Sequence, residues 1–156
     1  RKRQLNENLM MFFTGFTRFS SEVQKANRET KKDKISQLRQ MYELVDEAER
    51  IVTDQNTSLD EFGRLLDVTW KLKRQTGKAV STDHIDILYS KGIEAGALGG
   101  KLLGAGGGGF LVFYVQPEKQ EAVKKAMSDL MYIPFSFEDG GTRVIHYTPE
   151  IYVPQE

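Results

Sequence analysis

A glycine-rich segment constrains the fold of this chain more than any other feature of its sequence. Five of the six residues from Gly104 to Gly109 are glycines. Each glycine loses more backbone freedom on folding than any other residue, and an ordinary hairpin turn needs only one or two of them. The concentration of glycine indicates a backbone that either faces a phosphate with its amides or lets a neighbouring segment approach closely.

The residues around this loop exclude two common nucleotide-binding motifs. Three of its glycines fit the G-x-G-x-x-G pattern of dinucleotide-binding folds, but that pattern leads directly into a helix. Residues 110–115 (FLVFYV) follow instead, and their aromatic and β-branched side chains predict a strand. A Walker A loop is excluded as well, because Leu102 stands after Lys101 where that motif requires Ser or Thr. The loop is therefore predicted to join two strands.

Hydrophobic periodicity predicts helices before the loop and mainly strands after it. A capping box at Ser58–Glu61 and an N-cap at Ser81–Asp83 mark two helix starts. The expected helices cover about 20–53, 58–77, 83–96 and 117–130, and the expected strands 9–13, 97–103, 110–115, 133–137 and 144–147. We expect the first strand to be covered on both faces. The pattern predicts an α+β fold, an antiparallel sheet covered on one face by helices, with strand-helix-strand units resembling a ferredoxin-like core.

Composition limits the classes of function. The 156 residues are expected to form one domain, and the equal totals of 22 basic and 22 acidic residues produce no field that favours nucleic acid or a membrane. No apolar run approaches the roughly 18 residues of a membrane span, and the run at 9–13 is too short for a secretory signal. The absence of cysteine excludes disulfides and fits a cytoplasmic location. His84 and His146 are too isolated to predict a metal site.

The loop and its flanks resemble a known family. KLLGAGGGGF at 101–110, preceded by AGALGG at 95–100, resembles the third conserved motif of the GHMP kinases, which include galactokinase, homoserine kinase and mevalonate kinase. The resemblance extends over nearly the whole chain and implies the C-terminal domain of that family. The segments TGFTR at 14–18, WKLKR at 70–74 and STDHID at 81–86 are similar to the heptose 7-phosphate kinases.

That resemblance implies an ATP- and Mg²⁺-dependent reaction. The acceptor would be the anomeric hydroxyl of D-glycero-D-manno-heptose 7-phosphate, and the 1,7-bisphosphate would supply precursors of surface polysaccharide, such as lipopolysaccharide or capsule. The family's Ser-rich ATP-phosphate loop and the domain carrying its catalytic Asp do not occur in this sequence. Phosphoryl transfer depends on positioning and on electrostatic stabilisation. We therefore expect this domain to act with its own N-terminal kinase domain, which binds most of the ATP and Mg²⁺, and to be inactive alone.

The resemblance also implies roles for individual residues. The cleft loop would support the ATP phosphates and approach the acceptor, and its residues are Gly104, Ala105, Gly106, Gly107, Gly108 and Gly109. The residues expected at the sugar phosphate are Arg18, Ser20, Lys73, Arg74, Ser81, Thr82 and Asp83. No catalytic residue and no metal ligand is assigned.

Some of these cations have a second explanation. The group Lys71, Lys73, Arg74 and Lys78 is able to recognise a distal phosphate, but cations are also common at helix C-termini. Lys101 is able to reach a phosphate or to alternate out of a strand. Trp70 continues the apolar stripe of its helix, which favours a core position over a sugar-stacking one.

Two other functions remain open from the sequence. One is a GHMP kinase for another small acceptor, such as galactose, fucose or mevalonate. The other is a stand-alone ligand-binding domain, because ferredoxin-like folds serve many functions. The glycine loop argues against the second, since a sensor built on a sheet face has little use for such a loop.

Overall fold

The sheet has the predicted antiparallel arrangement. The computed structural model describes residues 1–15, 34–77, 80–104 and 108–147. Its strands are β1 (Leu9–Phe13), β2 (Gly99–Leu102), β3 (Phe110–Tyr114) and β4 (Met131–Ile133), in the order β2-β3-β1-β4. All three pairings are antiparallel, and the helical connections from β1 to β2 and from β3 to β4 complete a ferredoxin-like core. The predicted fold class is confirmed.

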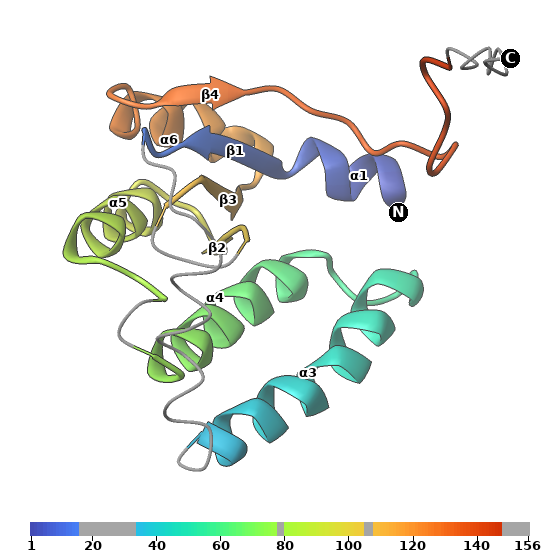
Figure 1. The fold of residues 1–156 in the computed structure, drawn as a ribbon, viewed down its shortest axis with the longest axis horizontal. Helices are drawn as coiled ribbons and strands as arrows, with labels where there is room; N and C mark the ends of the chain where they lie inside the picture. Colours follow the sequence, from blue (N-terminus) through green and yellow to red (C-terminus); the bar gives the residue numbers. More distant parts are fainter. Residues whose placement is uncertain (16–33, 78–79, 105–107, 148–156) are drawn as a thin grey trace, which may run out of the picture.

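Four of the helices in the described part of the chain, α3 to α6, lie in two groups around this sheet. The helices are α1 (Lys2–Glu7), α3 (Ile35–Thr53), α4 (Asp60–Gln75), α5 (Asp83–Glu94) and α6 (Gln120–Ala126), with a short 3₁₀ turn, η2 (Pro117–Lys119), before α6. Figure 1 shows α5 and α6 next to the sheet, with α4 below β2 and α3 on the far side of α4. The α4 helix thus connects the sheet to the outer helix.

The hydrophobic core lies between one face of the sheet and helices α5 and α6. Its buried residues from the sheet are Met10, Phe12, Leu102, Leu111 and Phe113, with Val115 just after β3. Those from the two helices are Ile85, Leu88, Tyr89 and Val123, with Met127 just after α6. Trp70 of α4 joins this core at 1% exposure, so the core interpretation of Trp70 is confirmed.

Several local predictions were wrong. The helix α1 was missed because six mostly polar residues show no apolar periodicity. In β1 only Met10 and Phe12 are buried, so this strand is fully covered on one face rather than two. The strand predicted at 133–137 lies instead at Met131–Ile133, and it ends there because Pro134 has no N–H to continue the ladder. Residues 144–147 are not part of a strand, and Ile145 is 98% exposed.

The capping box predicted at Ser58–Glu61 is not formed, although the helix begins where it was expected. The Ser58 hydroxyl accepts the backbone N–H of Asp60 at 3.2 Å, but the N-cap residue of α4 is Leu59, which makes no side-chain cap hydrogen bond. The Glu61 carboxylate instead accepts a hydrogen bond from Arg64 at 2.5 Å on the exposed face of α4. An (i, i+3) ion pair on the helix surface has replaced the second half of the predicted motif.

Helix α4 approaches β2 at the distance of backbone contact. A Cβ atom added to Gly99 would lie 1.9 Å from the carbonyl oxygen of Gly63 and 2.7 Å from the backbone nitrogen of Asp67. A Cβ added to Gly63 would in turn lie 2.7 Å from the ring of Tyr114. These two glycines allow the helix to lie directly against the edge strand.

A polar network fixes the start of α4 to the sheet. The Tyr114 hydroxyl donates to Oδ1 of Asp60 at 3.2 Å and accepts from Nδ2 of Asn8 at 2.8 Å. The other Asp60 oxygen accepts from Gln116 at 2.6 Å. Burial, followed by the negative charge of Asp60, raises the pKa of Tyr114 to about 12. The folded chain therefore favours the neutral phenol.

Replacing Tyr114 by phenylalanine is expected to change how stability depends on alkaline pH. A phenol whose pKa is raised on folding stabilises the chain fully below the unfolded value of about 10. That contribution is lost as the pH rises through about 12. The stability difference between the parent chain and Tyr114→Phe should therefore shrink between pH 9 and pH 11.5, as measured by urea unfolding. A difference that stays constant over this range would show that Tyr114 titrates normally.

Candidate functional site

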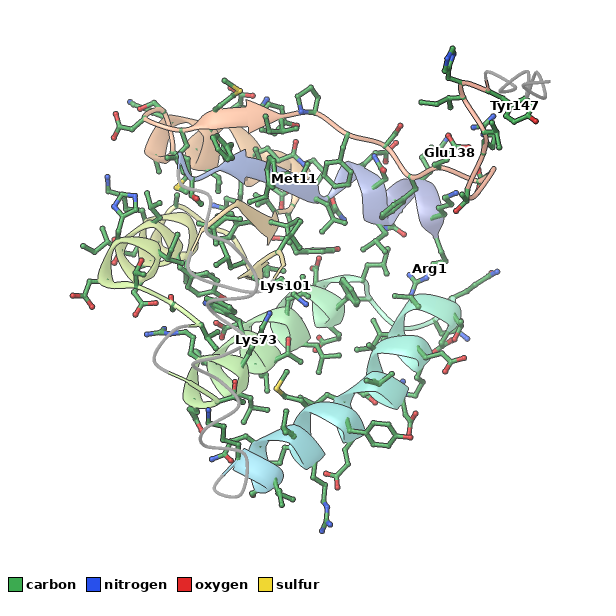
Figure 2. All side chains as sticks on the ribbon, viewed as in Figure 1. Arg1, Met11, Lys73, Lys101, Glu138 and Tyr147 are labelled. Atoms are coloured by element: carbon green, nitrogen blue, oxygen red, sulfur yellow. The ribbon has the colours of Figure 1, made fainter. Side chains whose placement is uncertain are left out.

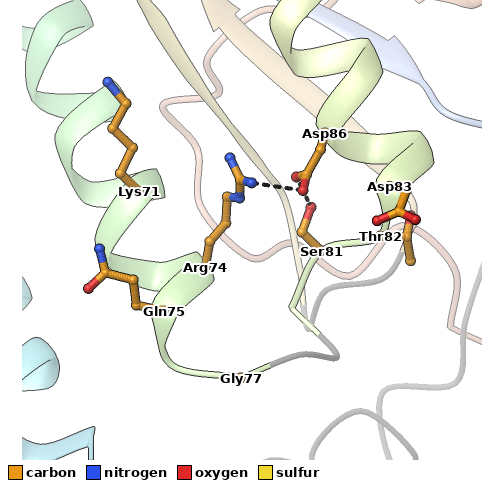
Figure 3. A pocket seen from close by; sticks show the side chains of 8 residues that line it. All are labelled: Lys71, Arg74, Gln75, Gly77, Ser81, Thr82, Asp83 and Asp86. Carbon is orange, nitrogen blue, oxygen red and sulfur yellow. Dashed lines mark hydrogen bonds and ion pairs between the residues drawn. The ribbon is translucent and has the colours of Figure 1, made fainter.

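A polar cavity of about 660 Å³ lies between the C-terminal end of α4 and the N-terminal end of α5. Figure 3 shows Arg74 of α4 pointing toward Asp86 of α5 and Ser81 across this space. Its lining residues are Lys71, Arg74, Gln75, Gly77, Ser81, Thr82, Asp83 and Asp86. The cavity combines cations, carboxylates, hydroxyls and an amide, which is the mixture that a polyhydroxylated, charged ligand requires.

One chain of interactions crosses the cavity. The Arg74 guanidinium donates to Oδ2 of Asp86 at 2.7 Å, and the Ser81 hydroxyl donates to Oδ1 of the same carboxylate at 2.6 Å (Figure 3). The Arg74 side chain is 39% exposed and that of Asp86 32%. A guanidinium has five N–H donors, so Arg74 still has donors for a ligand while its hydrogen bond to Asp86 fixes the orientation of the Arg74 side chain.

The N-terminal turn of α5 forms the opposite wall of the cavity. The Thr82 side chain accepts the backbone N–H of Ile85 at 3.3 Å, which confirms the predicted N-cap. Asp83 and Asp86 follow in the first helical turn, where a carboxylate is favourable. Hydroxyl and carboxylate groups therefore occupy fixed positions on this wall.

On the α4 wall, Lys71 belongs to a network that is already satisfied. Its ammonium donates to Oδ2 of Asp67 at 2.6 Å, and the Tyr89 hydroxyl donates to Oδ1 of that carboxylate at 2.9 Å. Burial, with a further contribution from Asp67, raises the pKa of Tyr89 above the ordinary range. This network joins α4 to α5.

Both described ends of the glycine loop are held by side chains. At its end, the Thr14 hydroxyl donates to the carbonyl of Gly109 at 2.9 Å and accepts the N–H of Gly109 at 3.1 Å. At its start, the Lys73 ammonium donates to the carbonyl of Gly104 at 3.2 Å. Burial, followed by the charge of Lys101, lowers the pKa of Lys73. The loop joins β2 to β3 as predicted, without a following helix.

The structure brings together most of the described residues that the sequence assigned to the substrate. Arg74, Ser81, Thr82 and Asp83 line one cavity, whereas Lys73 contacts the glycine loop instead. The resemblance also implied a place beside the substrate for Asp86, but its contact with Arg74 was not predicted, because only the packing of α4 against α5 brings the two side chains together. Six positions named from the sequence lie outside the described residues: Arg18, Ser20, Lys78, Ala105, Gly106 and Gly107.

The described residues do not fit a metal site. Among them, no group of three or more His, Cys, Asp or Glu side chains could hold a metal ion. The Mg²⁺ that the resemblance implies thus finds no ligand set in this part of the chain. Within the same residues, no helix has the length and apolar character that crossing a membrane requires.

Two curated proteins similar to this chain are kinases. The D-glycero-alpha-D-manno-heptose 7-phosphate kinase of Campylobacter jejuni is 29% identical over 145 residues, which are 90% of this chain and 42% of that kinase. The mevalonate kinase of Thermococcus sibiricus is 36% identical over 93 residues, which are 58% of this chain and 27% of that enzyme. The chain thus spans less than half the length of these relatives.

The solved structures and the family model agree with this result. The mevalonate kinase of L. major, solved with R-mevalonate, superposes with a TM-score of 0.65 at 25% identity, covering 78% of this chain and 37% of that one. The family model described as "GHMP kinases C terminal" matches residues 54–133, half of the chain, including α4, α5, the glycine loop and the strands that follow it. The chain therefore belongs to the GHMP kinases and has the fold of their C-terminal region.

Proposed function

We propose that this chain is the C-terminal domain of an ATP-dependent kinase that phosphorylates the anomeric hydroxyl of D-glycero-D-manno-heptose 7-phosphate to the 1,7-bisphosphate. The observation that carries this proposal is the similarity to the Campylobacter heptose 7-phosphate kinase along 90% of the chain. The polar cavity between α4 and α5 supports it, because its cations and hydroxyl-binding groups suit a phosphorylated sugar. The enzyme would work in the cytoplasm.

Each wall of the cavity has a part in this proposal. Arg74 binds the phosphate of the sugar, since a guanidinium makes paired charge-assisted hydrogen bonds with phosphate oxygens. Ser81, Thr82 and Asp83 bind sugar hydroxyls. The glycine loop lies beside the ATP phosphates, and Arg18 and Ser20 border the substrate. The chemical step needs the N-terminal kinase domain and its Mg²⁺, so this chain alone should not turn over.

A kinase of the mevalonate type is the second candidate. It is favoured by the 36% identity to the Thermococcus enzyme, although that match covers a smaller share of the chain. The two acceptors differ in charge and in size, because the heptose phosphate carries a phosphate and several hydroxyls where mevalonate carries one carboxylate. A cavity lined by as many polar groups as this one suits the larger acceptor better.

The test is an ATP-consumption assay of the full-length gene product with four acceptors. Heptose 7-phosphate, mevalonate, galactose and fucose are compared at equal concentration, and the product of the active reaction is identified by NMR. Consumption of ATP with the heptose phosphate alone, yielding the 1,7-bisphosphate, is the expected result. Preference for mevalonate would establish the second candidate, and no turnover with any acceptor would overturn the kinase proposal.

Replacing Arg74 by methionine in the same enzyme is expected to raise KM for the heptose phosphate at least ~10-fold, because a charge-assisted hydrogen bond contributes about 1.5–3 kcal/mol. The KM for ATP should change little. Arg64→Met is the matched control, since Arg64 lies on the exposed face of the same helix and pairs with Glu61. Equal changes in KM for the heptose phosphate in Arg74→Met and Arg64→Met would show that Arg74 does not bind the substrate.

A further inference from the structure

Two lysines lie together beside the start of the glycine loop. Lys73 is in the last turn of α4, and its ammonium contacts the carbonyl of Gly104 at 3.2 Å. Lys101 is in β2, two residues after Gly99 and therefore on the same face of the strand, which is the face that meets α4. The charge of Lys101 acts on Lys73, and Figure 2 shows both side chains in the region between β2 and α4.

Neither lysine has a carboxylate to neutralise it in the described residues. The ion pairs found there do not include Lys73 or Lys101. The acids on the neighbouring helices are already engaged: Asp67 accepts from Lys71 and Tyr89, and Asp86 accepts from Arg74 and Ser81. Two partly buried cations are thus held near each other without local compensation.

The helix C-terminus does not account for this arrangement. A cation in the last turn of α4 is favourable for the helix dipole, which explains Lys73 alone. Lys101 comes from a strand and gains nothing from that dipole. Its charge instead adds to the effect of burial in lowering the pKa of Lys73, so this arrangement opposes the protonation of Lys73. Groups whose pKa is shifted by burial together with a specific charged neighbour are concentrated at functional sites.

We propose that Lys73 and Lys101 together bind one phosphoryl group, through its anionic oxygens, at the start of the glycine loop. This inference rests on the proposed kinase function and adds a second anion position, separate from the cavity that contains Arg74. A phosphoryl dianion between the two ammonium groups replaces their repulsion by two attractions. The phosphoryl group belongs either to a nucleotide or to a sugar phosphate, which share this chemistry.

The experiment measures the side-chain pKa of Lys73 in this chain by NMR, with inorganic phosphate as the probe. In the free chain the Lys73 pKa should lie below its ordinary value, and saturating phosphate should raise it. Lys101→Met should raise the Lys73 pKa in the free chain and weaken phosphate binding at least ~10-fold. Lys73→Met should weaken phosphate binding by a similar factor.

Lys125→Met is the matched control. Lys125 is exposed on α6, so its removal lowers the net charge equally but should leave phosphate binding and the Lys73 pKa unchanged. Equal weakening by Lys101→Met and Lys125→Met, or a Lys73 pKa that does not respond to phosphate, would overturn the site. Stability gives a further readout: Lys101→Met should not destabilise the chain, whereas a purely structural lysine would.

Competition separates the two sources of the phosphoryl group. Displacement of phosphate by mannose 6-phosphate indicates a sugar phosphate, displacement by ATP indicates a nucleotide, and displacement by neither overturns the site. The outcome is also separable from that of the kinase assay. Phosphate binding through both lysines in a protein without kinase activity would retain this site and reject the proposed function. An active heptose kinase whose KM values are unaffected by Lys73→Met and by Lys101→Met would support the proposed function and reject the phosphate site.

Discussion

Replacing Gly99 by valine is expected to lower the free energy of unfolding by at least ~3 kcal/mol, at the upper end of the usual cost of overpacking. The first atom of the new side chain would lie 1.9 Å from a backbone oxygen of α4. Helix backbone cannot move aside as a flexible side chain can, so α4 must separate from β2. Strand propensity alone predicts that Gly99→Val raises the free energy of unfolding, because valine is far more favourable in a strand than glycine.

The matched control for this substitution is Gly140→Val. A Cβ atom at Gly140 would also be crowded, at 2.7 Å from Glu138 and 2.9 Å from Arg143, but these contacts are the ends of exposed side chains. The control should cost less than ~0.5 kcal/mol, as for most surface positions. Urea unfolding of both variants measures the difference. A Gly99→Val chain as stable as its parent would show that α4 does not lie on the backbone of β2.

The Gly99→Val substitution should also change the environment of Lys73 and Lys101. Lys73 and Lys101 approach each other only because α4 lies against β2, and Gly99 permits that contact. A chain that tolerates valine by moving α4 should therefore lose the depressed pKa of Lys73. The loss of this pKa shift would show that Gly99 acts by allowing α4 to contact β2, which the glycines of the following loop do not do.

The glycine segment illustrates what the sequence could and could not predict. Its position between two strands followed from the residues after it, and the structure confirms this. The sequence left open whether the glycines serve close approach or another need. Gly99 serves close approach, whereas a Cβ at Gly104 would meet nothing within 4 Å, and the positive φ of +89° explains glycine there. Only packing distances distinguish these two reasons.

In the candidate site, too, some features could be predicted from the sequence and others could not. Arg74 and Ser81–Asp83 were named through segments that resemble the heptose 7-phosphate kinases, and the capping residues and charges placed both segments at helix ends. The partners of Arg74 and Lys73 could not be named. Asp86 and Gly104 meet those side chains through the relative placement of α4, α5 and the loop, which depends on long-range packing. Local patterns in the sequence carry little information on such placement.

Replacing Trp70 by alanine is expected to cost about 3–5 kcal/mol of stability, the range for large aromatic residues removed from a core. Trp70 is 1% exposed, and its ring lies 6.1 Å from that of Tyr89, so it joins α4 to α5. Arg74 is one helical turn further along α4 and faces Asp86 of α5. The loss of this contact should therefore also weaken ligand binding in the cavity.

Trp70→Phe is the discriminating control. The indole Nε1 is buried and makes no hydrogen bond within the described residues, so phenylalanine removes an unsatisfied donor while keeping most of the aromatic packing. We expect this variant to lose less than ~2 kcal/mol and to keep its ligand affinity, because conservative core substitutions are tolerated best. Unfolding is followed by circular dichroism, since Trp70 is the chain's single tryptophan. Unchanged stability in Trp70→Ala, with affinity for a sugar phosphate lost in both variants, would instead identify Trp70 as a surface on which the sugar stacks.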